Sequence, residues 1–213
     1  MESVLDRPIG LEVRRALVEA MRILHDRGLV NLLGGNASVR VTLPDGTTFI
    51  YITPSGAVKP LLSPEDIAVI GLDGTVYEGK PSIEYRMHLA VYRSRSNVRA
   101  VVHAHNTRAV LAAALGVELD PNLLGVEAKY YLGGCVGRVG AYEPGSEQLA
   151  EAVASALKDC NVAILEKHGA VAVGVSDDPR QAIYEAVDRL EVLEELAEAS
   201  LMAEVLRRVR IGH

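Results

Sequence analysis

The chain has 213 residues, of which 49% are hydrophobic and 23% charged, with a formal net charge of −6 and a pI near 5.5. These values are typical of a soluble α/β protein that can bury a sizeable core. The sequence has no basic stripe and no Trp, so we do not expect the protein to bind nucleic acid.

Residues 1–10 lack the basic start and apolar stretch of a signal peptide, and no run of about 18 apolar residues predicts a transmembrane helix. We therefore expect a cytoplasmic protein that does not bind membranes. The two cysteines, Cys135 and Cys160, are too few for a disulfide framework or a cysteine-rich zinc site.

The predicted elements alternate between helices and hairpins along the chain. Apolar residues at helical spacing before Gly28 predict a first helix over 9–28. β-Branched runs on either side of Pro-Asp-Gly predict a hairpin over 37–43 and 47–53. The later expected elements are a strand over 67–71 with a second after an Asp-Gly turn, helices over 82–95, 107–116, 144–159 and 177–209, a strand over 98–105, and two strands within 161–174. Hairpins among helices favour a mixed, largely antiparallel sheet over a doubly wound parallel fold.

Three histidines stand where strands are expected to end. His103 and His105 are two residues apart in VVHAH, so their side chains should point to the same side of a strand, and His168 lies in EKHG between two apolar strands. A single His-x-His pair is more often incidental than functional, but the third histidine favours a metal site. Glu84 lies four residues before His88, on one face of a predicted helix. Three imidazoles and one carboxylate are a common way to bind Zn²⁺ and leave room for substrate oxygens.

Three short loops combine glycine, hydroxyl and amide groups. LLGGNASVR contains Gly35 and Asn36, ITPSG contains Ser55 and Gly56, and Ser82 stands at a predicted helix N-cap. Each loop alone is more simply explained as a turn. Together, beside a candidate metal site, their free amides and hydroxyls favour a site for a phosphorylated ligand.

The segments GGNASVR, ITPSG, KPSIEYRMHLAVY, VVHAH and EKHGAVAVG occur in the order seen in class II aldolases, and the chain resembles the L-fuculose-1-phosphate aldolase family of the aldolase–epimerase–adducin head superfamily. The resemblance covers about residues 10–195. It implies that 1–213 is a single class II aldolase-like domain, with a C-terminal helix and tail after the core. It also implies a three-layer αβα fold, one Zn²⁺ per subunit, and a homotetramer with sites at subunit interfaces.

The resemblance also implies roles for individual residues. Glu84 matches a glutamate that binds zinc in the empty site and acts as acid and base during turnover. An intersubunit catalytic tyrosine is expected in the segment 120–134, as Tyr130 or Tyr131. Ile83 replaces a serine of the fuculose enzymes, so it contributes only a backbone amide to the phosphate. The other implied positions are the zinc ligands His103, His105 and His168 and the phosphate-binding residues Gly35, Asn36, Ser55, Gly56 and Ser82.

The activity that the resemblance implies is zinc-dependent, reversible cleavage of a ketose 1-phosphate similar to L-fuculose 1-phosphate. The products would be dihydroxyacetone phosphate and an aldehyde such as lactaldehyde. Alternatives on the same zinc site are a methylthioribulose-1-phosphate dehydratase and a ribulose-5-phosphate 4-epimerase, although epimerases tend to have aspartate where Glu84 stands. A non-enzymatic scaffold like the adducin head is disfavoured, because such proteins lose the metal ligands that this chain has.

Overall fold

A mixed β-sheet forms the centre of the protein. The computed structural model describes residues 8–211, and within them eight strands pair in the order β4-β3-β2-β1-β5-β8-β7-β6. The strands are β1 Asn36–Thr42, β2 Thr48–Ile52, β3 Ala68–Gly71, β4 Val76–Glu78, β5 Ala100–Ala104, β6 Val136–Val139, β7 Val162–Leu165 and β8 Gly169–Gly174. The β6–β7 pair is parallel and the other pairs are antiparallel, which confirms the expected mixed, largely antiparallel sheet.

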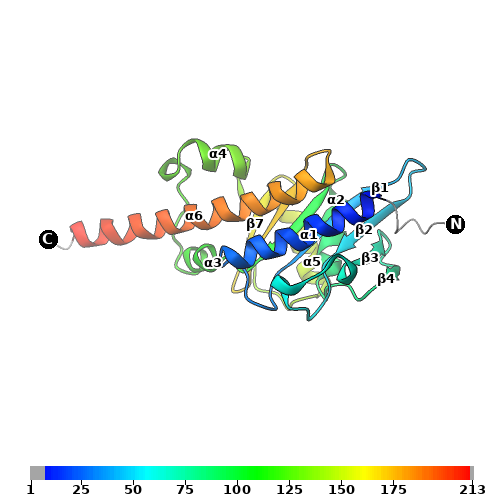
Figure 1. Ribbon diagram of the computed structural model, residues 1–213. Helices are drawn as coiled ribbons and strands as arrows, with labels where there is room; N and C mark the ends of the chain where they lie inside the picture. Colours follow the sequence, from blue (N-terminus) through cyan, green and yellow to red (C-terminus); the bar gives the residue numbers. More distant parts are fainter. Residues whose placement is uncertain (1–7, 212–213) are drawn as a thin grey trace.

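Helices cover both faces of this sheet (Figure 1). Helices α1, α3 and α6 pack on one face, and α2 and α5 pack together on the other. Side chains of a strand alternate between the faces, so Val102 of β5 joins the first core and Val101 joins the second. The helices are α1 Pro8–Asp26, α2 Tyr85–Ser94, α3 Thr107–Ala114, α4 Val126–Leu132, α5 Glu147–Ala156 and α6 Pro179–Ile211, with short 3₁₀ turns at η2 Lys59–Leu61, η3 Pro64–Asp66 and η4 Pro121–Leu123. The protein is thus a single three-layer α/β domain.

The C-terminal end of α6 extends beyond the rest of the domain (Figure 1). Several large apolar side chains on these last turns are exposed: Met202, Val205, Leu206 and Val209. Among residues 8–211, no helix is both long and apolar enough to cross a membrane. The last two residues of the expected tail, 212–213, lie outside the described part of the chain.

The structure corrects the predicted start of one helix and contains one helix and one strand that were not predicted. Helix α2 begins at Tyr85 with Glu84 as its N-cap, so the prediction of Ser82 as the N-cap was wrong. Ser82 is instead tied to the end of β2, where its N–H donates to the carbonyl of Thr53 at 3.1 Å. Helix α4 and strand β6 were not predicted, because short segments beside Gly133 and Gly134 carry little periodicity.

Cys135 and Cys160 form a disulfide, with Cα atoms 5.4 Å apart and a sequence separation of 25 residues. Two cysteines do not make a framework of several bonds, but they do close one loop. The bond joins the segment that follows α4 to the segment that precedes β7. It therefore ties the unpredicted α4–β6 region to the edge of the sheet.

Candidate active site

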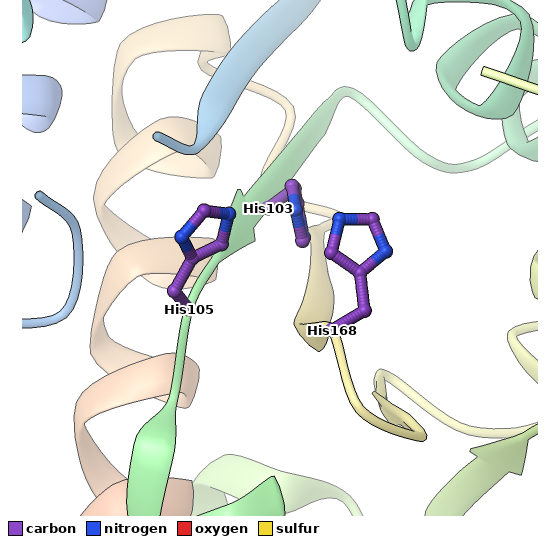
Figure 2. Close-up of side chains that lie close together, drawn as sticks. All are labelled: His103, His105 and His168. Carbon is purple, nitrogen blue, oxygen red and sulfur yellow. The ribbon is translucent and has the colours of Figure 1, made fainter. Parts of the chain in front are cut away.

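His103, His105 and His168 meet where β5 ends and the β7–β8 hairpin turns back (Figure 2). The ring centroid of His103 lies 5.3 Å from that of His105 and 4.7 Å from that of His168. One nitrogen from each ring lies within 4.8 Å of the others, which is a spacing that a single metal ion could satisfy. The structure therefore brings together the three histidines that the sequence singled out.

A hydrogen bond from its own ring fixes the orientation of the His103 side chain. Its Nδ1 donates to the carbonyl oxygen of Ala170 on the neighbouring strand β8, at 3.0 Å. This bond fixes the ring and leaves Nε2 as a buried nitrogen without a hydrogen-bond partner, as is also the case for Nδ1 of His168. A backbone carbonyl commonly orients a metal-binding histidine in this way. The buried, unpartnered Nε2 of His103, which faces Glu84, shows that this residue fits a metal ion.

Glycines allow the strands and loops to come close around these rings. A Cβ on Gly169 would lie 2.1 Å from the carbonyl oxygen of Ala104 and 3.1 Å from Cε1 of His103. Gly35 has φ +70°, and a Cβ there would lie 2.9 Å from the carbonyl oxygen of His103. Lys167, beside His168, has φ 59°, which is uncommon for a residue other than glycine. Close backbone approaches and tight turns at these residues thus fix the positions of the imidazole rings.

Glu84 lies between two of the histidines and the start of β1. Its Oε2 is 3.5 Å from Nε2 of His103, and its Oε1 is 3.6 Å from Nε2 of His168. Asn36 donates from Nδ2 to Oε2 at 2.8 Å, whereas Oε1 is buried without a hydrogen-bond partner. The two carboxylate oxygens are therefore unequal, with one anchored and the other available.

Burial decides the charge of the buried imidazoles. It lowers the pKa of His103 to about 4 and the pKa of His88 to about 3, although Glu84 opposes both shifts. Burial also lowers the pKa of His105. For Glu84, burial raises the pKa, but His103 and the hydrogen bond from Asn36 outweigh it and the net shift is downward. At neutral pH, His103 and His105 are thus neutral, the form that binds metal, and they lie beside an ionised Glu84.

The three expected phosphate loops lie next to one another and close to the histidines. Thr53 joins them: its Oγ1 accepts from the N–H of Ala37, and its carbonyl accepts from the N–H of Ser82. Pro54 and Pro81 form a further bridge between the second and third loops. Gly56 has φ +72°, and no atom lies within 4 Å of a Cβ built on it. The structure thus brings together Gly35, Asn36, Ser55, Gly56 and Ser82, with Ile83 exposed beside them.

A buried lysine supports the second of these loops. Lys59 is only 2% exposed, and its Nζ donates to the carbonyl oxygens of Pro54 and Ala57 at 3.3 and 3.4 Å. Burial lowers the pKa of Lys59. Lys59 was not predicted from the sequence, because nothing in the local pattern shows that its ammonium group folds back onto its own loop.

Tyr130 and Tyr131 lie on α4 rather than among the histidines. They are 76% and 37% exposed, and their rings contact one another with centroids 5.0 Å apart. The backbone carbonyl of Tyr131 accepts from Arg189 of α6. Among the described contacts, neither tyrosine side chain touches Glu84 or the three histidines, so the described contacts of a single chain place neither of these two tyrosines in the site.

Comparisons with known proteins place this site in a family. The sequence pattern of the class II aldolase and adducin N-terminal domain matches residues 15–201. The chain is 36% identical over 189 residues to the L-fuculose phosphate aldolase of Methanocaldococcus jannaschii, covering 89% of this chain and 96% of that protein. It is 32% identical over 195 residues to the 3-oxo-tetronate 4-phosphate decarboxylase of Haemophilus influenzae, covering 88% and 86%.

Comparison of the fold with solved structures indicates the same family. The crystal structure of L-fuculose-1-phosphate aldolase from Thermus thermophilus has a TM-score of 0.80 and 34% identity, covering 92% of this chain and 95% of that one. The match extends over nearly the whole chain and includes both the sheet and the histidine-bearing turns. The chain therefore belongs to the class II aldolase and adducin N-terminal domain family, and it is an aldolase-type enzyme of the lyase class.

Proposed function

We propose that this enzyme is a zinc-dependent aldolase that reversibly cleaves a ketose 1-phosphate of the L-fuculose 1-phosphate type. The products would be dihydroxyacetone phosphate and an aldehyde such as lactaldehyde. The observation that carries the proposal is the position of Glu84, which faces His103 and His168 and keeps one buried oxygen unpaired. A carboxylate beside an open metal site suits proton transfer next to a carbonyl group.

His103, His105 and His168 would hold the ion, and Glu84 would be a fourth ligand before substrate arrives. Imidazole nitrogens suit Zn²⁺, and the buried, unpartnered Nε2 of His103 supports this assignment. When bound, Zn²⁺ supplies Lewis-acid polarisation of the substrate carbonyl and stabilises the negative charge that develops on its oxygen.

Glu84 moves the proton that the reaction requires. When the carbon–carbon bond breaks, its electron pair stays on the ketone fragment, and the hydroxyl group of the other fragment loses its proton as it becomes the aldehyde. Glu84 takes up a proton and delivers it to the ketone-fragment carbon, so no net proton is gained or lost. In the reverse direction the same carboxylate removes the proton. Its ionised state at neutral pH suits the removal step, and its anchored Oε2 keeps Oε1 directed into the site.

The three loops would bind the phosphate group. Gly35, Asn36, Ser55, Gly56 and Ser82 would contribute amides and polar side chains, and Ile83 would contribute only its backbone amide. The exposed position of Gly56 with its positive φ supports a backbone amide that is open to an anion. The buried ammonium group of Lys59 lies under the same loop and adds positive charge near it.

We also propose a cytoplasmic homotetramer in which Tyr130 or Tyr131 acts in the site of a neighbouring subunit. This tyrosine would protonate the aldehyde oxygen when the carbon–carbon bond forms. Its exposure on α4, together with the exposed apolar turns at the end of α6, supports a position at a subunit interface.

The direct test is to incubate the zinc-loaded protein with dihydroxyacetone phosphate and a panel of aldehydes, and to assay the cleavage of L-fuculose 1-phosphate. We expect zinc-dependent formation and cleavage of a ketose 1-phosphate. Glu84→Gln should keep the metal, because Gln is isosteric and its Oε1 can still accept from Asn36, and should lose most turnover. Near-normal cleavage by this variant would contradict the role of Glu84.

The similarity to the 3-oxo-tetronate 4-phosphate decarboxylase supports a second candidate, the decarboxylation of a phosphorylated 3-oxo acid at the same site. The dehydratase and epimerase alternatives use related sugar phosphates. Assays for aldehyde, carbon dioxide, water loss and epimer on the matching substrates would separate these reactions. Release of carbon dioxide without any aldol activity would favour the decarboxylase.

A further inference from the structure

A chain of buried hydrogen bonds leads from Glu84 into the core. Asn36 donates to Glu84 at 2.8 Å, and the Oδ1 of Asn36 lies 2.6 Å from Nε2 of His88. The other ring nitrogen of His88 lies 2.7 Å from Oγ of Ser38, which in turn lies 2.8 Å from the hydroxyl of Tyr92. We call Tyr92, Ser38, His88 and Asn36 the relay. All four residues are buried, with at most 5% exposure.

The relay joins strand β1 to helix α2. Within each element, its residues are spaced so that their side chains lie on one face. Asn36 and Ser38 are two residues apart on β1 and therefore point to the same face of the sheet. Glu84, His88 and Tyr92 are four residues apart and form one stripe at the start of α2 and along it. The relay consequently fastens the end of α2 that carries Glu84 to the strand that carries Asn36.

The chemistry of the partners sets the direction of every hydrogen bond. Because the Nδ2 of Asn36 donates to the Glu84 carboxylate, its Oδ1 must face His88, and an amide oxygen only accepts. The hydrogen of the neutral His88 ring is therefore on Nε2, and its Nδ1 accepts from the hydroxyl of Ser38. The oxygen of Ser38 then accepts from Tyr92. Each donor points towards Glu84, an arrangement in which successive bonds polarise one another.

The far end of the relay is fixed as well. The guanidinium group of Arg40 lies over the ring of Tyr92, 4.8 Å from its centroid, and also donates to the backbone carbonyl of Tyr92. Tyr92 therefore has little freedom to turn its hydroxyl away from Ser38. Fixed at both ends, the chain allows one orientation of the Asn36 amide.

We propose that His88, with Ser38 and Tyr92 behind it, is a positioning residue for the aldolase reaction: it locks the Asn36 amide so that Glu84 is held by Oε2 and presents Oε1 for proton transfer. This inference rests on the proposed function for its effect on catalysis, but not for the orientation of the relay. None of the three residues touches the histidine group directly in the described contacts. Neighbours that orient the groups of a metal site typically change activity by about 10- to 100-fold when they are replaced.

The relay can be tested by kinetics with a matched pair of variants. His88→Met fills a similar volume without ring hydrogen bonds, whereas His88→Gln can donate to Asn36 and accept from Ser38. We expect His88→Met to lower kcat by about 10- to 100-fold with little change in KM or metal content, and His88→Gln to recover a large part of the loss. Equal kcat in wild type and His88→Met, or an effect on KM alone, would overturn the proposal.

Two single-hydroxyl variants, Ser38→Ala and Tyr92→Phe, cover the case in which His88→Met does not fold. We expect each to keep its thermal midpoint within a few degrees and to lower kcat by a smaller factor than His88→Met. If both hydroxyl variants had wild-type kcat, the residues behind His88 would have no positioning role.

An NMR measurement separates failure of the relay from failure of the proposed function. Long-range ¹H–¹⁵N spectra of protein labelled at histidine should show His88 with its hydrogen on Nε2. The Asn36 side-chain amide should be protected from exchange in wild type and lose that protection in His88→Met. A hydrogen on Nδ1, or an unprotected Asn36 amide in wild type, would overturn the relay whatever substrate the enzyme uses. If both signatures appear but no sugar phosphate is cleaved, the relay stands and the proposed function fails.

Discussion

Gly34 lies against His105 so closely that a Cβ at position 34 would be 2.5 Å from Cε1 and 2.7 Å from Nδ1 of the imidazole. The loop cannot easily move away, because the N–H of Gly34 donates to Oδ1 of Asn31 at 2.7 Å. The first of the proposed phosphate loops and the proposed metal site are therefore in direct contact. A side chain at this position would displace His105 or the loop.

We expect Gly34→Ala to weaken metal binding by about 10-fold, because His105 must turn away from the other two imidazoles. Competition with a chromogenic chelator would measure the affinity. Gly140→Ala is the matched control, since a Cβ there meets only Tyr142 at 3.7 Å. Equal metal affinity in the two variants would show that His105 does not bind the metal as proposed.

His168→Ala should reduce bound zinc from one ion per chain to a small fraction, because two imidazoles remain and the tetrahedral set is incomplete. Elemental analysis of dialysed protein would show this loss, and the rise in melting temperature on adding zinc should disappear with it. His25→Ala is a suitable control, because His25 lies on α1 and is not one of the proposed ligands. Full zinc content in His168→Ala would contradict the proposed ligand set.

The metal-free protein should lose stability as the pH falls from about 6.5 towards 4. Burial lowers the pKa of His103 to about 4 and of His88 to about 3, below the ordinary value of 6.5, so in this range the unfolded chain binds protons that the folded chain does not. Urea unfolding at several pH values would measure the slope. His88→Gln should make the slope shallower, and an identical slope in this variant would contradict the neutral state of His88.

The proposed tyrosine can be identified by mixing subunits. If Tyr130 or Tyr131 acts in a neighbouring site, its Phe variant and Glu84→Gln should each be nearly inactive alone. Tetramers refolded from a mixture of the two should regain part of the activity, because some sites then combine an intact Glu84 with an intact tyrosine. Mixed tetramers, verified by native mass spectrometry, that stay inactive would place the tyrosine and Glu84 in the same chain or exclude the tyrosine.

The Cys135–Cys160 bond should stabilise the protein by about 3.5 kcal/mol, the value expected for a closed loop of this length. Adding dithiothreitol should lower the melting temperature of the wild type and leave a Cys135→Ala/Cys160→Ala double variant unchanged. Thiol titration of the denatured, unreduced wild type should find no free thiol, because the chain has two cysteines and both are bonded. Two free thiols would show that the bond does not form under those conditions.

Local patterns in the sequence were enough to predict much of the fold and the core of the site. The two-residue period of a strand placed His103 and His105 on one side, and apolar runs on both sides of EKHG predicted the hairpin that carries His168. The hairpins among the helices predicted the largely antiparallel sheet. The ordered motifs indicated the family, which the comparisons confirm.

The tertiary structure alone decided which distant residues touch. Ser38 meets His88 across 50 residues of sequence, Lys59 folds back onto the carbonyl of Pro54, and the two cysteines meet at the edge of the sheet. The parallel β6–β7 pair likewise depends on how the chain returns after α5. Sequence periodicity reports only which face of an element is apolar, whereas these contacts depend on how the helices pack on the sheet and how the strands pair. That physical difference is why the histidine group could be predicted and the relay behind Glu84 could not.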